Sequence, residues 1–493
     1  MPKYLLTFIR LLCAAVIILM VALNIFRDKS VINGDSAQYI IIAESLAHGH
    51  GLRMLNYPGE PLSNLAPLLS VILAPVIYFF GRLLWLMHMI VAIFSVVSLV
   101  AFYKLFRLSA ERIYCFWAVT LLASSRLFLS CSSNILTDIV FFALGGLTFY
   151  FLTRYIAGGS KAISKDGILV ITFLALSFLC RYIGAVIFLT AVVAIIFSGI
   201  EKKIAARKIL FLSIFFLPVV ALVALAGGTS NSHFTASVTE QIFSVSGYGF
   251  SSGTIFSHPG LFWARCWNNI IVYLKIASEF CFSSYAIKSG IGIVNYFCVI
   301  SVLIITAIGV RRDVMEKRWV GVSFITIYFF FLVIWPFYED GRYFLPLAGY
   351  ILIYFINFVY KEKTLFVNIF LTAVILSNFL FIVNYFGPDS ASPVVDNFIS
   401  INQWMRGNLD AKRLVMSRKP TMTYFYSGQK SIPFPFVSDP AQVWKVIRDN
   451  GVKYIIFDQG SAMDVYARVI RDYGNKLKFL HAVDATAVFE VIG

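Results

Sequence analysis

Apolar segments alternate with short polar or basic turns along most of the chain. A membrane-spanning helix needs about 20 apolar residues. Residues 4–26 meet this length and could pass for a signal peptide, but no convincing cleavage site follows them. They therefore predict an uncleaved first span with a cytoplasmic N-terminus. Residues 83–106 predict the second span. Residues 65–80 are short for a span and contain Pro67 and Pro75, so we expect a half-buried juxtamembrane helix there.

The later apolar segments continue this alternation to residue 386. The basic clusters between them, such as residues 201–208 (EKKIAARK) and 311–318 (RRDVMEKR), then all fall on the cytoplasmic side, which is the positive-inside pattern. The sequence therefore predicts a mainly α, polytopic bundle of about eleven transmembrane helices, with juxtamembrane helices in the first outer loop. A long outer loop is expected over residues 227–288. The further predicted helices are residues 113–130, 139–156, 167–180, 183–199, 209–226, 290–310, 319–335, 343–360 and 364–386.

The last hundred or so residues are less apolar and have the pattern of a soluble domain. Ser438-Asp439-Pro440 predicts a capped helix with proline at its first position, and Gly451 predicts its end. Alternation of helix and strand indicates a small α/β unit. We expect a transmembrane domain over residues 1–388 and a soluble extracytoplasmic α/β domain over residues 389–493. The other elements expected in this tail are strands at 452–457, 477–481 and 487–491 and a helix at 461–473.

Composition and charge agree with a membrane protein. Hydrophobic residues make up 59% of the chain and charged residues 13%, whereas soluble domains carry about 25% charged residues. The net charge of +16 could indicate a nucleic-acid partner, but the lysines and arginines lie in short clusters between apolar segments. We therefore exclude nucleic acid as a partner. The seven cysteines contain no CxxC pair or zinc-like spacing, so no metal site is predicted.

Residues 32–51 (INGDSAQYIIIAESLAHGHG) form a polar turn followed by a predicted amphipathic helix. Gly34 allows the turn, and Asp35 stands where a helix N-cap would be, so we expect an ionised carboxylate facing the positive end of the helix. Tyr39 falls one turn later on the same face. A carboxylate fixed at a membrane surface suits binding or acid–base chemistry. Taken alone, however, the stretch favours a simple capping role for Asp35.

The predicted topology gathers ionisable residues at the outer face of the membrane. Charged residues at membrane depth are costly and commonly functional, so the set is a candidate site. For one member, Glu240, a solvated loop charge is the preferred interpretation. The set comprises Asp35, Asp138, Glu240, Glu339, Asp340, Arg181 and Arg342.

Carboxylates and arginines at one membrane face suit a transfer reaction on a lipid-linked phosphate. An arginine binds phosphate through a forked pair of hydrogen bonds. A carboxylate can accept the proton of an attacking hydroxyl or amine. Because a phosphate leaves readily without protonation, one base and one phosphate clamp would suffice, unlike the two carboxyl groups of glycoside hydrolysis.

Four motifs, in order, resemble those of the GT-C membrane glycosyltransferases, in particular the protein O-mannosyltransferases and the bacterial aminoarabinose–lipid A transferase. GDSAQYIIIAESLAHGHG (34–51) is similar to the first-loop Asp-x-x-x-Tyr pattern, and SNILTDIVFF (133–142) to the second outer loop with its acidic residue. CRYIGAVIF (180–188) resembles the hairpin between the fifth and sixth helices, and GRYFLPLAGYIL (341–352) the later RY-LP segment. The likeness spans most of residues 1–360.

The resemblance implies an inverting transferase that uses a polyprenyl-phosphate sugar, with Asp35 as general base. Asp138 would position the acceptor or the base, Arg342 and Arg181 would hold the donor phosphate, and Tyr39 would support Asp35. The turn before the RY-LP segment would supply further substrate-binding side chains. These are Tyr338, which could stack on a sugar, and Glu339, Asp340 and Tyr343.

Two positions depart from the aminoarabinose transferase pattern, and the first is Asp35-Ser36, where that group has Asp-Glu. Where that group has Lys-Pro before the juxtamembrane helix, this chain has Ala66-Pro67, so a phosphate-binding lysine is missing and lipid A is not the expected acceptor. Arg53 and Arg82 are the substitutes the sequence offers. No cofactor is expected. Asp35 and Asp138 could share a divalent metal, but the loop lacks an Asp-x-Asp pair, so metal dependence is not favoured.

The expected partners are a polyprenyl-phosphate-linked sugar, an acceptor lipid, glycan or protein, and the membrane itself. We expect a multi-pass protein of the bacterial inner membrane with its C-terminal domain periplasmic or extracellular. Two alternatives stay open. A transporter or flippase of lipid-linked sugars would place ionisable residues mid-membrane on repeated, broken helices, and no repeat is visible here. An inactive homologue would keep the fold without the reaction.

Overall fold

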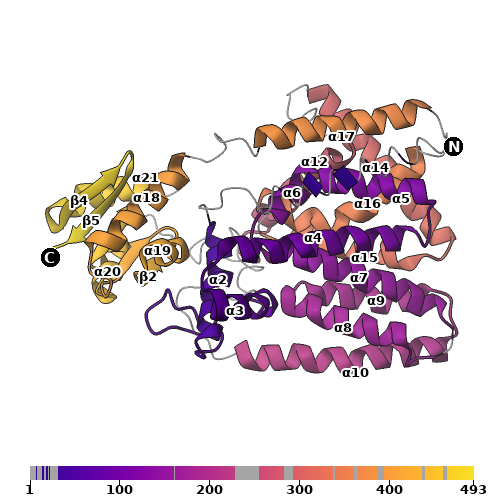
Figure 1. Ribbon diagram of the computed structural model, residues 1–493, viewed down its shortest axis with the longest axis horizontal. Helices are drawn as coiled ribbons and strands as arrows, with labels where there is room; N and C mark the ends of the chain where they lie inside the picture. The colour runs from indigo at the N-terminus through magenta and orange to yellow at the C-terminus, as the bar shows by residue number, and fades with distance from the viewer. Residues whose placement is uncertain are drawn as a thin grey trace.

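The computed structural model describes residues 32–159, 161–227, 255–282, 292–336, 339–359, 365–385, 393–435, 439–458 and 463–492, with a few isolated positions before residue 32. A bundle of long helices lies at one end of the molecule, and a smaller unit around a β-sheet lies at the other (Figure 1). Two helices of the first loop lie where the bundle meets the β-sheet unit (Figure 1). The prediction of a mainly helical protein with a small α/β unit is confirmed, whereas the first predicted span, residues 4–26, lies outside the described residues.

The bundle contains most of the helices that the sequence predicts. In the described part of the chain, four helices are long and apolar enough to cross a membrane, or five if one bent pair counts as a single span. The total of about eleven spans therefore stays a prediction. The helices are α4 (Leu84–Phe106), α5 (Arg112–Ser124), α6 (Arg126–Ser132), α7 (Thr137–Ala157), α8 (Lys165–Cys180), α9 (Gly184–Phe197), α10 (Lys202–Gly227), α12 (Pro259–Phe282), α14 (Gly292–Met315), α15 (Trp319–Ile334), α16 (Leu345–Val359) and α17 (Leu365–Tyr385).

Two predictions for the bundle are wrong in detail. The single helix expected over residues 113–130 is broken, because α5 and α6 meet at 63° around Ser125. The Ser125 hydroxyl accepts a hydrogen bond from the Phe128 amide and thereby starts a new helix, as serine side chains commonly do. The outer loop expected over residues 227–288 contains α12, whose Trp263 and Trp267 are exposed. Polar residues interrupt its apolar pattern, which hid the helix.

The centre of the bundle is packed around Phe102 of α4. Its ring stacks on Phe142 of α7, with 4.2 Å between the ring centroids. Gly146 of α7 and Gly349 of α16 leave room for the ring, since a Cβ at Gly146 would lie 2.9 Å from Phe102 Cε2. This close approach fixes α4, α7 and α16 against one another. It thereby also fixes the start of α7, where Asp138 lies.

The first loop contains α2 (Gly34–Ala47) and the predicted juxtamembrane helix α3 (Leu68–Phe80). Asp35 is not the N-cap of α2. The side chain of Asn33 is the cap and accepts a hydrogen bond from the Ser36 amide at 2.8 Å, while Asp35 lies in the first turn. The Asp35 carboxylate is thereby left for another partner. The helix ends before Gly49 and Gly51, both with a φ of +79°, as the sequence predicts.

The C-terminal unit is built on a five-stranded sheet in the order β2-β1-β3-β5-β4. Strand β1 is parallel to β2 and β3, whereas β5 is antiparallel to β3 and β4. The capped helix after Asp439 and the elements that follow it are confirmed; the elements before it were not predicted. The α-helices and strands of the C-terminal unit are, in chain order, α18 (Pro393–Asn408), β1 (Val415–Ser417), α19 (Pro420–Ser427), β2 (Ser431–Pro433), α20 (Pro440–Asp449), β3 (Tyr454–Phe457), α21 (Met463–Tyr473), β4 (Leu477–Val483) and β5 (Thr486–Val491).

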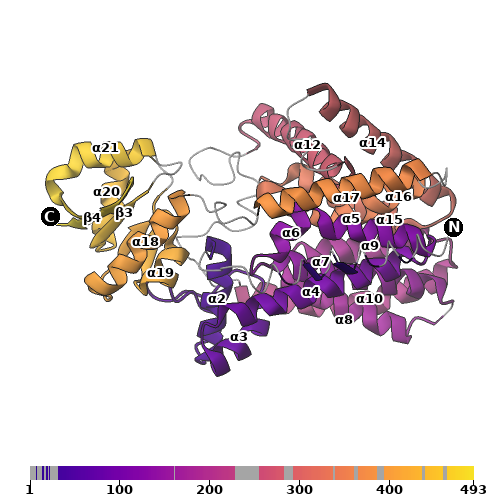
Figure 2. The same cartoon turned by 45° about the horizontal axis from the view of Figure 1, so that its top comes forward.

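Helix α19 of the C-terminal unit holds the turn that precedes α2. The backbone N–H of Ile32 donates a buried hydrogen bond to the Tyr426 hydroxyl at 2.6 Å, and the Thr421 hydroxyl donates to the Gly34 carbonyl at 3.0 Å. Figure 2 shows α19 beside α2. The turn carrying Asp35 is therefore fixed on both sides by residues almost 400 positions away in the chain.

The α8–α9 hairpin makes a tight turn at Arg181, and Gly184 permits it. The Gly184 amide donates to the Arg181 carbonyl at 2.8 Å. A Cβ at Gly184 would lie 2.6 Å from the backbone nitrogen of Phe178 and 2.7 Å from its Cα, so no side-chain rotation could relieve the clash.

We expect Gly184→Ala to open this hairpin and to destabilise the protein by about 1–3 kcal/mol, as overpacking does in other cores. The melting temperature of the purified protein in detergent measures this effect. The matched control is Gly407→Ala in α18, where an added Cβ meets nothing within 4 Å. Equal melting temperatures for the two variants would contradict the packing argument.

Tyr426→Phe should loosen the Asp35 turn, because it leaves the buried Ile32 N–H without its partner at a cost of about 1–3 kcal/mol. Hydrogen–deuterium exchange should become faster in a peptide that begins several residues before Ile32 and includes the Asp35 turn. Tyr424→Phe on the same helix is the control, since the Tyr424 hydroxyl makes no hydrogen bond among the described contacts. Unchanged exchange in Tyr426→Phe would show that α19 does not hold the turn.

Candidate active site

Two ion pairs connect four of the predicted site residues. Arg342 Nη2 lies 2.6 Å from Asp35 Oδ2, and Arg181 forms an ion pair with Asp138. Asp35 comes from the first turn of α2 and Asp138 from the first turn of α7. Arg181 follows α8, and Arg342 lies in the 3-10 helix η1 (Glu339–Phe344). Four separate segments thus meet in one place.

Tyr343 joins the two ion pairs into a single cluster. The guanidinium carbon of Arg181 lies 4.8 Å from the centroid of the Tyr343 ring, and that of Arg342 lies 5.4 Å from it. Both distances are in the range of cation–π contacts. The Tyr343 carbonyl accepts a hydrogen bond from the Tyr328 hydroxyl at 3.0 Å, which ties η1 to α15. We call Asp35, Asp138, Arg181, Arg342 and Tyr343 the charged cluster.

The two ion pairs differ in their exposure to solvent. The side chains of Asp138 and Arg181 are 3% and 17% exposed, and that of Arg342 is 18% exposed. The Asp35 side chain is 47% exposed. A ligand entering from the aqueous side can therefore reach the Asp35 carboxylate, whereas Asp138 is closed off. Breaking the Arg181–Asp138 pair would leave an unpaired charge in a low-dielectric site. This buried pair is therefore the fixed part of the cluster.

Tyr39 lies on the face of α2 that packs against the bundle. Its hydroxyl is 3.3 Å from the hydroxyl of Thr137, the neighbour of Asp138, and this is the hydrogen bond it makes. Burial raises the pKa of Tyr39 above its usual range, so the phenol stays neutral. Tyr39 therefore connects α2 to the start of α7. The resemblance had implied that Tyr39 supports Asp35.

A pair of amide side chains also joins the turn before α2 to the turn before α7, and the sequence analysis had not singled them out. Asn33 Nδ2 donates to Asn134 Oδ1 at 3.2 Å, and Asn134 Nδ2 donates to the Ser130 carbonyl at 2.8 Å. Asn33 therefore caps α2 and bridges to the turn before α7. Its place directly before Gly34 is a capping signal that the sequence carried, but the bridge to Asn134 could not be seen there.

Some predicted residues cannot be placed, and others lie elsewhere. Tyr338 and Glu240 lie outside the described residues, and the side chains of Glu339 and Asp340 are also outside the described part. Arg53 and Arg82 were offered as substitutes for a missing phosphate ligand. Arg53 Nη1 donates to the Glu60 carbonyl at 3.0 Å, and Arg82 pairs with Glu44 at 2.7 Å, so neither contacts the charged cluster.

The chemistry of the charged cluster is that of an anion site beside a proton acceptor. Two guanidinium groups offer forked donors, and one accessible carboxylate accepts protons. Among the described residues, no group of three metal-binding side chains lies close together. The expectation that the reaction needs no metal remains a prediction from the sequence.

Comparison with known proteins extends this picture. Residues 64–225 match the sequence model of a family described as dolichyl-phosphate-mannose-protein mannosyltransferase. No curated protein matches the sequence. The structure resembles the oligosaccharyltransferase of Archaeoglobus fulgidus, solved with a tethered acceptor peptide, with 12% identity, a TM-score of 0.61, and coverage of 99% of this chain and 74% of that one.

Two further solved structures are more distant. The mycobacterial arabinofuranosyltransferase AftD shares 12% identity and a TM-score of 0.50, over 98% of this chain and 41% of its own. ArnT from Cupriavidus metallidurans shares 10% identity over 99% and 98% of the two chains, and its TM-score of 0.47 is too low to support an inference. The family match and the shared architecture confirm the resemblance seen in the sequence: the chain has the fold of the GT-C membrane glycosyltransferases.

Proposed function

We propose that the protein transfers a monosaccharide from a polyprenyl-phosphate sugar to a lipid, glycan or protein acceptor, with inversion at the anomeric carbon. The observation that carries this proposal is the exposed Asp35 carboxylate held against Arg342 in the first loop of a GT-C fold. The description of the matched family names a dolichyl-phosphate sugar, which supports a polyprenyl-phosphate donor. The matched segment includes Asp138 and Arg181.

The donor phosphate would bind at the arginines of the charged cluster. Arg342 is the partner that we propose a phosphate would meet, because its present counter-ion, Asp35, is half exposed. A phosphate oxygen that takes the forked donors of Arg342 replaces one anion by another, so no buried charge is left unpaired. Binding of the donor would thereby release the Asp35 carboxylate from its ion pair.

Asp35 would then act as the general base. It accepts the proton of the acceptor hydroxyl or amine while that atom attacks the anomeric carbon from the face opposite the phosphate. The bond between the anomeric carbon and the phosphate oxygen breaks, and its electron pair leaves with polyprenyl phosphate. The leaving group is already a stable anion, so no general acid is needed.

The buried pair would have a positioning role. Asp138 keeps Arg181 charged and fixed, and Arg181 in turn contacts the ring of Tyr343. Because Tyr343 follows Arg342 directly, this contact orients the segment that meets the donor. We propose that the site faces the extracytoplasmic side of the inner membrane, with the C-terminal unit on that side, and that the reaction uses no cofactor.

We expect Asp35→Asn to lower turnover by about 10²–10⁴-fold, the usual contribution of a general base, without unfolding the protein. The assay uses purified protein in nanodiscs with a panel of radiolabelled polyprenyl-phosphate sugars, and it follows release of polyprenyl phosphate and transfer of label. Wild-type turnover should survive EDTA if no metal takes part.

Asp449→Asn is the matched control, because Asp449 is an exposed carboxylate of the C-terminal unit. It should behave as wild type. Equal turnover in Asp35→Asn and wild type would remove Asp35 from the mechanism. Absence of turnover with every donor would instead favour a lipid-linked-sugar transporter or an inactive homologue.

A further inference from the structure

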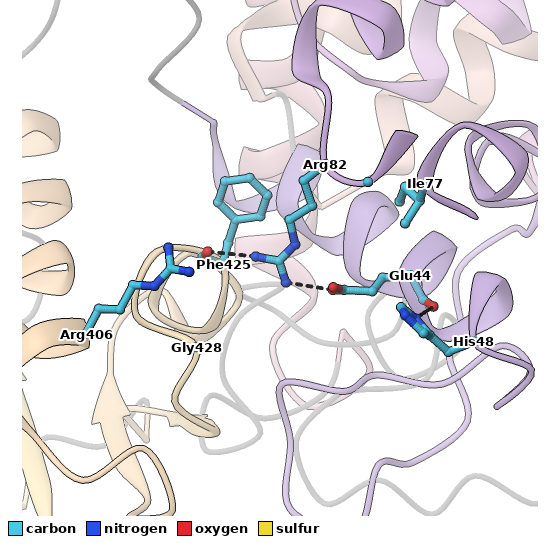
Figure 3. Close-up of a pocket in the computed structure, with 8 residues that line it drawn as sticks. Glu44, His48, Ile77, Arg82, Arg406, Phe425 and Gly428 are labelled. Atoms are coloured by element: carbon cyan, nitrogen blue, oxygen red, sulfur yellow. Dashed lines mark hydrogen bonds and ion pairs between the residues drawn. The ribbon is translucent and has the colours of Figure 1, made fainter. Parts of the chain in front are cut away.

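A pocket separate from the charged cluster lies between the first loop and the C-terminal unit. Its volume is about 470 Å³, which is in the range of small-ligand sites. Arg82, after α3, and Arg406, on α18, line it together with Glu44 of α2 and Phe425 of α19. Figure 3 shows the two arginine side chains extending from the two units toward the same space beside Phe425.

The charges that line this pocket do not balance. Arg82 Nη2 lies 2.7 Å from Glu44 Oε2, and its Nη1 donates to the Phe425 carbonyl at 3.1 Å. Arg406 has no partner among the described contacts and is exposed. The lining therefore contains two arginines and one carboxylate, so one positive charge is not neutralised by it. An anion bound in the pocket would compensate this charge and could accept hydrogen bonds from both guanidinium groups.

The position of the pocket indicates where such an anion would come from. Arg82 lies two residues before α4, a helix with the length and apolarity of a membrane span. The side chains of Tyr78, Phe79 and Phe80 at the end of α3, and Trp85 at the start of α4, are all exposed. Exposed aromatic residues at the end of a span are typical of the lipid headgroup region. From these aromatic side chains we infer that the pocket opens near the level of the lipid phosphates.

We propose that this pocket binds the phosphate of an anionic phospholipid, with Arg406 and Arg82 as its ligands and the lipid chains lying against the aromatic residues of α3. The forked donors of arginine fit a phosphate. The bound lipid would connect the C-terminal unit to the bundle through one shared headgroup. This proposal concerns a bilayer lipid rather than the sugar donor, so it does not depend on the transfer reaction.

Native mass spectrometry of the full chain in detergent, titrated with phosphatidylglycerol, tests the proposal. Phosphatidylglycerol should bind better than phosphatidylcholine. Arg406→Gln should weaken its binding about tenfold, as expected for the loss of charge-assisted hydrogen bonds, and Arg406→Glu should weaken it further. Arg406 has no partner among the described contacts, so both variants should fold. Arg448→Gln, an exposed arginine on α20, is the control and should bind as wild type.

Several results would overturn the proposal. Equal binding by Arg406→Gln and Arg448→Gln would show that the pocket is not the site. Equal binding of the two phospholipids would show that the pocket does not select an anionic lipid. Displacement of phosphatidylglycerol by equimolar inorganic phosphate would show a site for a free anion, and displacement by equimolar polyprenyl phosphate would assign the pocket to the donor.

Discussion

The site depends on one electrostatic constraint: an arginine at the edge of an apolar bundle needs an anion beside it. Removing a guanidinium group from water costs several kcal/mol unless a counter-ion compensates. Arg181 meets this requirement with Asp138, and Arg342 meets it with Asp35. The first pair is enclosed by protein, whereas the second is open on the side of Asp35. In the proposed reaction a phosphate serves as the alternative anion for Arg342, so donor binding and release of the base are one event.

The C-terminal unit belongs to the construction of this site. Helix α19 contacts the segment of α2 at both ends. Thr421 and Tyr426 hold the turn at the start of α2. At the other end, the Phe425 carbonyl accepts a hydrogen bond from Arg82, and Arg82 pairs with Glu44 in the last turn of α2. Helix α2 thus lies between the bundle and the sheet unit, attached to each. The position of the Asp35 carboxylate is consequently set by both units, although only the loop of the first unit contributes the carboxylate.

Much of the architecture could be predicted from local pattern. Helices such as α4 and α7 are long apolar runs with clear polar boundaries, and α20 begins at an Asp-Pro cap. Elements without such signals were missed. Strands β1 and β2 have three residues each, too few to show a period, and the bend between α5 and α6 depends on one serine hydroxyl.

The assignment of the cap of α2 failed for a physical reason. Asn33 and Asp35 are both good capping residues, and local sequence cannot decide between them. In the structure the Asp35 carboxylate pairs with Arg342, which lies 307 positions later in the chain, and Asn33 is the cap. The candidate residues were proposed because charges are rare in this chain and the predicted topology gathers them on one face. Their pairing could not be found, since it requires the distances between segments.

Exposure, rather than residue type, separates the roles of the two aspartates. A general base must be accessible to the acceptor group whose proton it takes. Asp138 begins α7 inside the bundle and is 3% exposed, so an acceptor hydroxyl cannot reach it without displacing Arg181. Asp35 begins a surface helix between two units and is 47% exposed. Of the two, only Asp35 satisfies the access that the proposed chemistry requires, and the buried pair is left to fix the arginine and the tyrosine around which the donor would bind.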